Sequence, residues 1–217
     1  MSSPTGAVGP PAGDGAVRAV LATRNPHKAV EIQGMLRRSV PHLQLLALDD
    51  PSLPATGEVV ESGTTFAANA LLKARAAAAA TGLPALADDS GIAVDVLGGA
   101  PGVFSARWSG RHGDDGANLA LLLAQLADVP VEERGAAFVC AAALVLPDGR
   151  EVVHHGRLDG VLAGAARGSG GFGYDPAFRP AGEDRTLGEM SADEKDAVSH
   201  RARAFATLAR QLPDLLR

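Results

Sequence analysis

One long hairpin is the feature that most constrains the fold of this chain. Residues 136–146 and 151–161 both have the pattern of extended strands, and Pro147-Asp148-Gly149 between them is a favourable hairpin turn. Shorter strand and helix patterns alternate along the rest of the chain. We therefore predict an α/β fold in which helices flank a mixed β-sheet.

Helix starts and apolar spacing predict the remaining elements. Asn25 is a candidate N-cap followed by Pro26 at the first helical position, and Thr64 or Thr65 is a candidate cap for a second helix. Further strands are predicted at 17–23, 43–48, 83–87 and 92–96, and helices at 26–36, 66–80, 114–127 and 193–216.

Composition narrows the class of protein. With 217 residues, 46% hydrophobic and 21% charged, the chain is expected to fold as one domain of two lobes over residues 17–217, after a flexible Gly- and Pro-rich tail at 1–16. It shows no secretory signal and no membrane-spanning run, so we expect a cytoplasmic protein without a membrane partner. The net charge of -5 and the lack of a long basic stretch disfavour nucleic acid as a partner.

The single cysteine and the histidines offer little chemistry. Cys140 excludes an intramolecular disulfide, and its apolar surroundings predict a buried, inert thiol. Five histidines lack the spacing of zinc ligands and are expected to be surface or core residues: His27, His42, His112, His154 and His155.

The segment Thr23-Arg24-Asn25-Pro26-His27-Lys28 forms a turn between a strand and a helix. Exposed amides and the positive end of the helix dipole make such a turn an anion site. Lys28 in the first helical turn opposes that dipole, and a bound phosphate would resolve the conflict. A plain capped helix with a solvated lysine is the alternative.

Two adjacent carboxylates, Asp88 and Asp89, follow an apolar strand and precede Ser90. They repel each other and lose hydration, so a cation or a basic neighbour is expected nearby. Their side chains point to opposite faces of an extended backbone, so that one would face a metal and the other would pair with a lysine, for which Lys73 is a candidate. Mg²⁺ takes one or two carboxylates together with phosphates and water, and Glu61 offers a third carboxylate. An ordinary Asx turn is the alternative.

The segment Gly168 to Pro176 holds four glycines and the aromatic residues Phe172 and Tyr174. Glycines let the backbone approach a ligand, and stacking of an aromatic ring on a base contributes about 1–3 kcal/mol. The segment lacks the Lys-Ser/Thr ending of a Walker loop. A flexible surface loop with one core aromatic is the alternative.

Donors gather near the start of the last predicted helix. Lys195 and Ser199 share a helix face by spacing, and His200 and Arg201 follow. These donors suit a base that carries a carbonyl group and would accept an exocyclic amine poorly. A solvated helix start with a capping box is the alternative.

Five segments occur in one order along residues 17–216: LATRNPHK, the helix with Asn69 and Lys73, LADDSGIAVDVLGGAPGVFSARWSG, GSGGFGYDP and SADEKDAVSHR. Together they resemble the inosine/xanthosine triphosphate pyrophosphatase family. The resemblance implies a homodimer with an elongated mixed sheet and a cleft between two lobes. It also implies Mg²⁺-dependent hydrolysis of dITP, ITP, XTP and dXTP at the α–β phosphate bond, which gives a monophosphate and pyrophosphate.

The resemblance further implies roles for individual residues. Asp89 would be a metal ligand and the proton acceptor that activates water, and Glu61 and Asp88 would assist the metal. Lys28 and Lys73 would neutralise charge on the pyrophosphate. The implied cofactor is Mg²⁺, one or more ions per subunit, for which Mn²⁺ can substitute. The implied substrate-binding residues are Thr23, Arg24, Asn25, Pro26, His27, Lys28, Ser90, Phe172, Gly173, Tyr174, Asp175, Lys195, His200 and Arg201.

The chain departs from the family pattern at three positions. Arg24 stands where many members have glycine, Ala68 replaces a glutamate, and Asp196 stands where asparagine is common. Two other functions remain open: hydrolysis of ordinary or pyrimidine triphosphates, and nucleotide sensing without catalysis. The acidic pair argues against a sensor, because carboxylates that face a triphosphate need a metal.

Overall fold

A mixed six-stranded sheet forms the centre of the computed structural model, which describes residues 17–216. The predicted tail at 1–16 lies outside these residues. The strand order is β2-β1-β3-β4-β5-β6; β1 pairs in parallel with β2 and β3, and the remaining pairs are antiparallel. The strands are β1 (Val17–Leu21), β2 (Leu43–Ala47), β3 (Ala85–Val94), β4 (Gly135–Val145), β5 (Glu151–Leu162) and β6 (Phe178–Pro180). The predicted α/β class and the long β4–β5 hairpin are confirmed.

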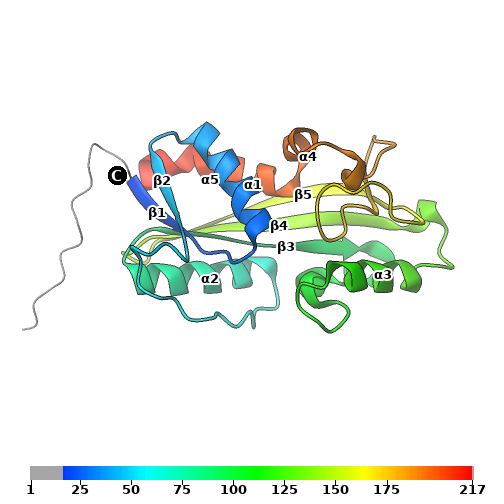
Figure 1. Ribbon diagram of the computed structural model, residues 1–217, viewed down its shortest axis with the longest axis horizontal. Coiled ribbons are helices and arrows are strands. Elements are labelled where there is room, and N and C mark those ends of the chain that lie inside the picture. Colours follow the sequence, from blue (N-terminus) through cyan, green and yellow to red (C-terminus); the bar gives the residue numbers. More distant parts are fainter. Residues whose placement is uncertain (1–16, 217) are drawn as a thin grey trace, which may run out of the picture.

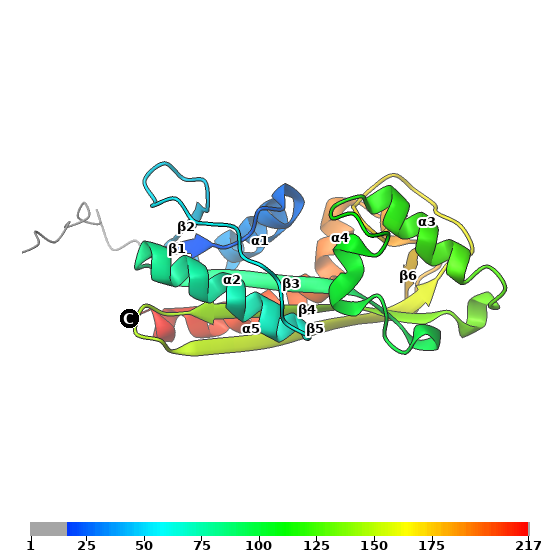
Figure 2. The ribbon, with the colours of Figure 1, turned by 90° about the horizontal axis from the view of Figure 1, so that it is seen from below.

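Helices cover both faces of this elongated sheet (Figure 1). On one face lie α1 (Pro26–Ser39), α4 (Ala192–Val198) and α5 (His200–Leu215), and on the other lie α2 (Phe66–Thr81) and α3 (Asp115–Gln125). Figure 2 shows that α1, α2 and α5 gather at one end of the long strands and α3, α4 and β6 at the other. The short 3-10 helices are η1 (Asp95–Leu97), η2 (Gly102–Arg107), η3 (Val131–Glu133) and η4 (Leu187–Glu189). From residue 17 to 216, no helix combines the length and the apolar character needed to cross a bilayer.

The two predicted helix caps are present. The Asn25 side chain accepts a hydrogen bond from the Lys28 backbone N–H, and Thr65 accepts one from Ala68. Such caps satisfy amides that have no partner within the helix. They fix where α1 and α2 begin and therefore where the side chains of their first turns lie.

The apolar core divides between the two ends of the sheet. At one end, α1 and α5 pack on one face and the alanine-rich α2 packs on the other, while a separate cluster joins α3 to the far ends of β3, β4 and β5. Cys140 is fully buried in the first of these clusters, and burial raises the pKa of its thiol to about 12. The prediction of a buried cysteine is confirmed.

The structure corrects the element pattern in three places. Asp88 to Gly91 do not interrupt a strand, because β3 runs without a break through them. The last helix is two helices: Ser199 has an extended backbone (φ -63°, ψ 148°), and its side chain caps α5 by accepting from Ala202. Strand β6 was not predicted, since three residues are too few to show a pattern.

Candidate active site

The candidate site lies where β3 loses its neighbouring strand. β1 pairs with β3 only at Val20–Ala85 and Leu21–Leu86, and then turns away into α1. Beyond Leu86, the described residues place no further strand on that edge of β3, so side chains from both sheet faces reach one cavity of about 790 Å³. All the residues proposed from the sequence line this cavity except Asp88.

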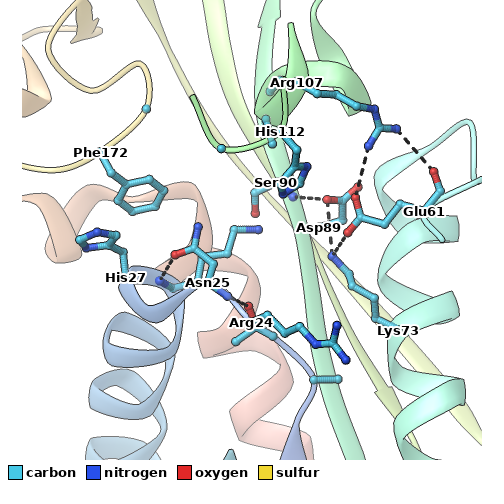
Figure 3. Close-up of a pocket in the computed structure, with 18 of the residues that line it drawn as sticks. Arg24, Asn25, His27, Glu61, Lys73, Asp89, Ser90, Arg107, His112 and Phe172 are labelled. Carbon is cyan, nitrogen blue, oxygen red and sulfur yellow. Dashed lines mark hydrogen bonds and ion pairs between the residues drawn. The ribbon is translucent and has the colours of Figure 1, made fainter. Parts of the chain in front are cut away.

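An acidic cluster forms on the α2 side of the cavity (Figure 3). Asp89 Oδ2 accepts a hydrogen bond of 3.0 Å from Asn69, and Lys73 Nζ lies 3.7 Å from Asp89 Oδ1 and 2.8 Å from Glu61 Oε1. Arg107 Nη1 approaches the other Glu61 oxygen at 3.9 Å. Two carboxylates thus share one lysine at the cavity wall.

The two carboxylates of this cluster differ in their electrostatics. Burial raises the pKa of Asp89 above its ordinary value, although Lys73 opposes the shift. Burial acts in the same direction on Glu61, but the charges of Lys73, Lys28 and Arg107 and the hydrogen bond from Lys73 together outweigh it and lower the pKa of that group. Asp89 is therefore the more basic of the two, which suits a group that accepts a proton.

Asp88 faces the opposite side of β3. Its fully buried Oδ2 lies 3.0 Å from Lys28 Nζ and 3.3 Å from Arg201 Nε and accepts a 2.7 Å hydrogen bond from Ser90. Burial would raise the pKa of Asp88, but Lys28, Arg201 and Lys73, with the hydrogen bond from Ser90, together outweigh it and hold that pKa well below its usual range. The predicted lysine pairing exists: Asp88 pairs with Lys28, while Lys73, the candidate from the sequence, lies beside Asp89.

This placement changes two interpretations of the sequence. Asp88 itself offsets the charge of Lys28 at the start of α1, so no bound phosphate is needed to explain that lysine. Among residues 17–216, the structure shows no group of three His, Cys, Asp or Glu side chains placed to hold a metal ion. A site made from Asp88, Asp89 and Glu61 together is therefore not formed in this arrangement.

Donors gather at the other end of the cavity, between α1, α4 and α5. Lys195 Nζ lies 2.7 Å from Asp175 Oδ2 and 2.9 Å from Glu31 Oε1, and Arg201 pairs with the second Glu31 oxygen. Lys195 and Arg201 are only 5% and 2% exposed. The alternative of a solvated lysine at a capped helix start is therefore wrong, because Lys195 is buried and paired with two carboxylates.

His200 is buried beside these cations. Its ring stacks on Phe138 with centroids 4.9 Å apart, and its Nδ1 has no hydrogen-bond partner among the described residues. Burial, followed by the charges of Arg201 and Lys195, lowers its pKa well below the ordinary value. His200 is therefore neutral at pH 7. Gly156 on β5 makes this placement possible, because a Cβ there would collide with the backbone of His200.

The glycine-rich loop from Gly168 to Pro176 packs mainly against protein. A Cβ on Gly168 would overlap the Gly188 backbone, and one on Gly171 (φ 71°) would overlap the Asp175 side chain. Tyr174 and Asp175 are buried, and Asp175 Oδ2 accepts from the Phe172 N–H at 2.8 Å. The glycines therefore shape the loop more than they admit a ligand, and Phe172 is the aromatic side chain of this loop that is left partly exposed at the cavity.

Replacing Tyr174 with phenylalanine should lower the free energy of unfolding by about 1–3 kcal/mol. The Tyr174 hydroxyl donates a buried 2.8 Å hydrogen bond to the Ser105 carbonyl of η2, and its loss leaves that acceptor without this donor. Urea denaturation of both proteins measures the difference. An unchanged midpoint would show that this link between the loop and η2 does not contribute to stability.

Several cavity residues were missed or set aside in the sequence. His27 was set aside only as a metal ligand and was implied as a substrate-binding residue; its ring centroid lies 5.5 Å from that of Phe172 in a stacked arrangement. His112 and Arg107 also line the cavity, from the irregular segment after β3. Glu31 sits one helical turn beyond Lys28, and that spacing is the only signal in the sequence that points to it.

Comparisons with known proteins agree with one another. A model of the Ham1 family matches residues 19–211. The chain is 58% identical over 200 residues to the dITP/XTP pyrophosphatase of Streptomyces coelicolor, covering 92% of this chain and 98% of that protein. A solved nucleoside-triphosphatase / dITP/XTP pyrophosphatase from Mycobacterium abscessus is 55% identical, with a TM-score of 0.73 and coverage of 88% and 97%. A HAM1 protein from Coxiella burnetii is 38% identical, with a TM-score of 0.81 and coverage of 91% and 99%.

Proposed function

This chain belongs to the Ham1 family, and from that premise we propose that it is a dITP/XTP pyrophosphatase. The substrates would be deaminated purine nucleoside triphosphates: dITP and XTP, and with them ITP and dXTP. Hydrolysis between the α and β phosphates would release a nucleoside monophosphate and pyrophosphate. Such an activity removes non-standard nucleotides from the pool.

One observation carries this proposal: a single cavity holds both two neighbouring carboxylates, Asp89 and Glu61, and a cluster of buried donors. Asp89 and Glu61 lie at one end with Lys73, and Lys195 and Arg201 lie at the other. Carboxylates next to a triphosphate make chemical sense when a divalent cation separates the two. A donor cluster makes sense opposite a base with carbonyl oxygens.

The residues present fit Mg²⁺. Asp89 and Glu61 are hard oxygen donors that share one ammonium group, and Mg²⁺ takes one or two such carboxylates and leaves its other positions to phosphate and water. We propose that these two residues would hold the ion, with Mn²⁺ as a substitute, while Asp88 orders Lys28 and Arg201. When bound, the ion would neutralise phosphate charge and favour ionisation of a water.

The side chains of this chain would perform the remaining work of hydrolysis. Asp89, whose pKa is raised chiefly by burial, would accept a proton from the attacking water. Asn69 donates a hydrogen bond to Asp89 Oδ2 and so fixes the orientation of this carboxylate. Lys28 and Lys73 would neutralise charge that develops on the pyrophosphate, since both line the cavity. Thr23 to His27 would receive the phosphates at the start of α1.

Recognition of the base would fall to Phe172, Lys195, His200 and Arg201. Phe172 offers a ring for stacking, and the cations would donate to the 6-oxo group. An adenine amine would leave such donors without acceptors, at about 1–3 kcal/mol for each buried bond. The wall of the cavity around the base would be completed by Ser90, Gly173, Tyr174 and Asp175, of which Tyr174 and Asp175 are buried.

The same premise extends to the assembly. We propose that residues 17–217 act as one unit with two lobes, because the cavity takes residues from both ends of the sheet. We also propose a homodimer, on the strength of the motifs shared with the pyrophosphatase family.

Pyrophosphate release from a panel of dITP, XTP, dATP, dGTP and dUTP tests the function. We expect kcat/KM for dITP and XTP to exceed that for dATP by on the order of a hundredfold, since more than one donor would lose its acceptor. Equal rates on dUTP or dATP would favour a general phosphohydrolase. Binding of ITP with Mg²⁺ but no release of pyrophosphate would favour a sensor.

A further inference from the structure

One wall of the cavity is a loop with little support of its own. The segment between β2 and α2 passes the cavity from Thr56 to Glu61, and most of residues 54–60 are exposed. Because exposed loop residues gain little from burial, their order depends on a few specific contacts.

Arg24 supplies the contacts in the middle of this loop. Its Nη2 donates hydrogen bonds of 3.0 Å to the Thr56 carbonyl and 3.1 Å to the Gly57 carbonyl. Across the described residues, these are the hydrogen bonds that the structure shows for positions 54–59. A planar, permanently charged guanidinium suits two neighbouring carbonyl oxygens.

The far end of the loop is held from other elements. Glu61 pairs with Lys73 of α2 at 2.8 Å, and Arg107 after β3 donates to the Glu61 carbonyl at 3.5 Å. Arg24 therefore joins the turn before α1 to the loop that ends in Glu61.

We propose that Arg24 is a positioning residue, which fixes the loop and thereby holds Glu61 at the cavity. The inference deepens the proposed function and rests on it for the part played by Glu61. It assigns Arg24 to the loop because both N–H groups of its Nη2 donate to carbonyl oxygens there. Direct phosphate binding would use the remaining Nη1 and Nε donors, and the kinetics below distinguish the two roles.

The mobility of a spin label on the loop tests whether the hydrogen bonds of Arg24 hold the loop in place, in protein free of metal and nucleotide. Ala55 is exposed and does not line the cavity, and the one native thiol, Cys140, is fully buried, so a label on Ala55→Cys is selective. We expect Arg24→Ala and Arg24→Lys to make the label markedly more mobile, because neither keeps the planar donor group. Arg150→Ala is the matched control, since Arg150 is exposed and pairs with Asp148 in the hairpin turn. It should leave the spectrum unchanged.

Kinetics of the unlabelled variants then separate positioning from phosphate binding. We expect kcat for dITP to fall about tenfold in Arg24→Ala, as two charge-assisted hydrogen bonds are lost, with KM and the inhibition constant of pyrophosphate within about twofold of wild type. An unchanged label spectrum, or a mobile label with unchanged kcat, overturns the proposal. The proposal is also overturned if KM and the inhibition constant of pyrophosphate both rise in Arg24→Ala and return to the wild-type values in Arg24→Lys. If the wild-type protein released no pyrophosphate from dITP or XTP, the proposed function would fail, while the label would still report on how Arg24 holds the loop.

Discussion

Asp89→Asn should reduce the turnover of dITP by about 10²–10⁴-fold. The amide retains the shape of the side chain and can still bond to Asn69, but it accepts no proton at neutral pH and binds a divalent cation weakly. Because Asp89 lines the cavity with Lys73 beside it, the loss should appear in kcat more than in the affinity for the nucleotide.

Steady-state release of pyrophosphate measures this effect. Asp159→Asn is the matched control, since Asp159 pairs with Arg157 on an exposed part of β5 and should retain full activity. Turnover of dITP near the wild-type rate by Asp89→Asn would remove Asp89 from its proposed role.

Asp88→Asn should be the most destabilising single change at the site. Its carboxylate is fully buried between Lys28 and Arg201, and removal of one partner from a buried ion pair costs about 3–5 kcal/mol. Urea unfolding at pH 7 measures this loss. The exposed Asp159→Asn control should cost less than about 1 kcal/mol, because solvent screens surface pairs.

The same carboxylate predicts how stability depends on pH. The pKa of Asp88 is lower in the folded chain than the ordinary value of about 4. Its stabilising effect is therefore complete above pH 4 and is lost as the pH falls toward the folded value. Below pH 4, the wild-type protein should lose stability more steeply than Asp88→Asn. Parallel pH profiles for the two proteins would contradict this assignment.

Local signals in the sequence were sufficient for much of the fold. Asn25 and Thr65 cap their helices as predicted, and the turn at Pro147-Asp148-Gly149 joins two long strands. These features depend on side chains and backbone a few residues apart. The break at Ser199 was missed because the apolar stripe of α5 continues the helical spacing across it.

Most of the residues that line the cavity were also predicted, but the pairing of their charged side chains was not. The motifs identified Asp88, Lys28 and Lys73, whereas the pairing of Asp88 with Lys28 depends on how α1 packs over β3. Glu31 has no motif of its own, and its contacts with Lys195 and Arg201 span more than 160 residues. Partners so distant in sequence leave no local pattern.

The early end of β1 has a consequence for how this protein can change. Beyond Leu86, Asp89 and Lys73 lie on one face of β3, while Ser90, His200 and Arg201 lie on the other, so the groups proposed to activate water and those proposed to read the base stand on different sheet faces. Lys28 is the link between the two faces, because it shares the Asp88 carboxylate with Arg201. A substitution at Arg201 should therefore reach the phosphate end of the cavity through Asp88, whereas one at Phe172 leaves both cationic partners of that carboxylate in place.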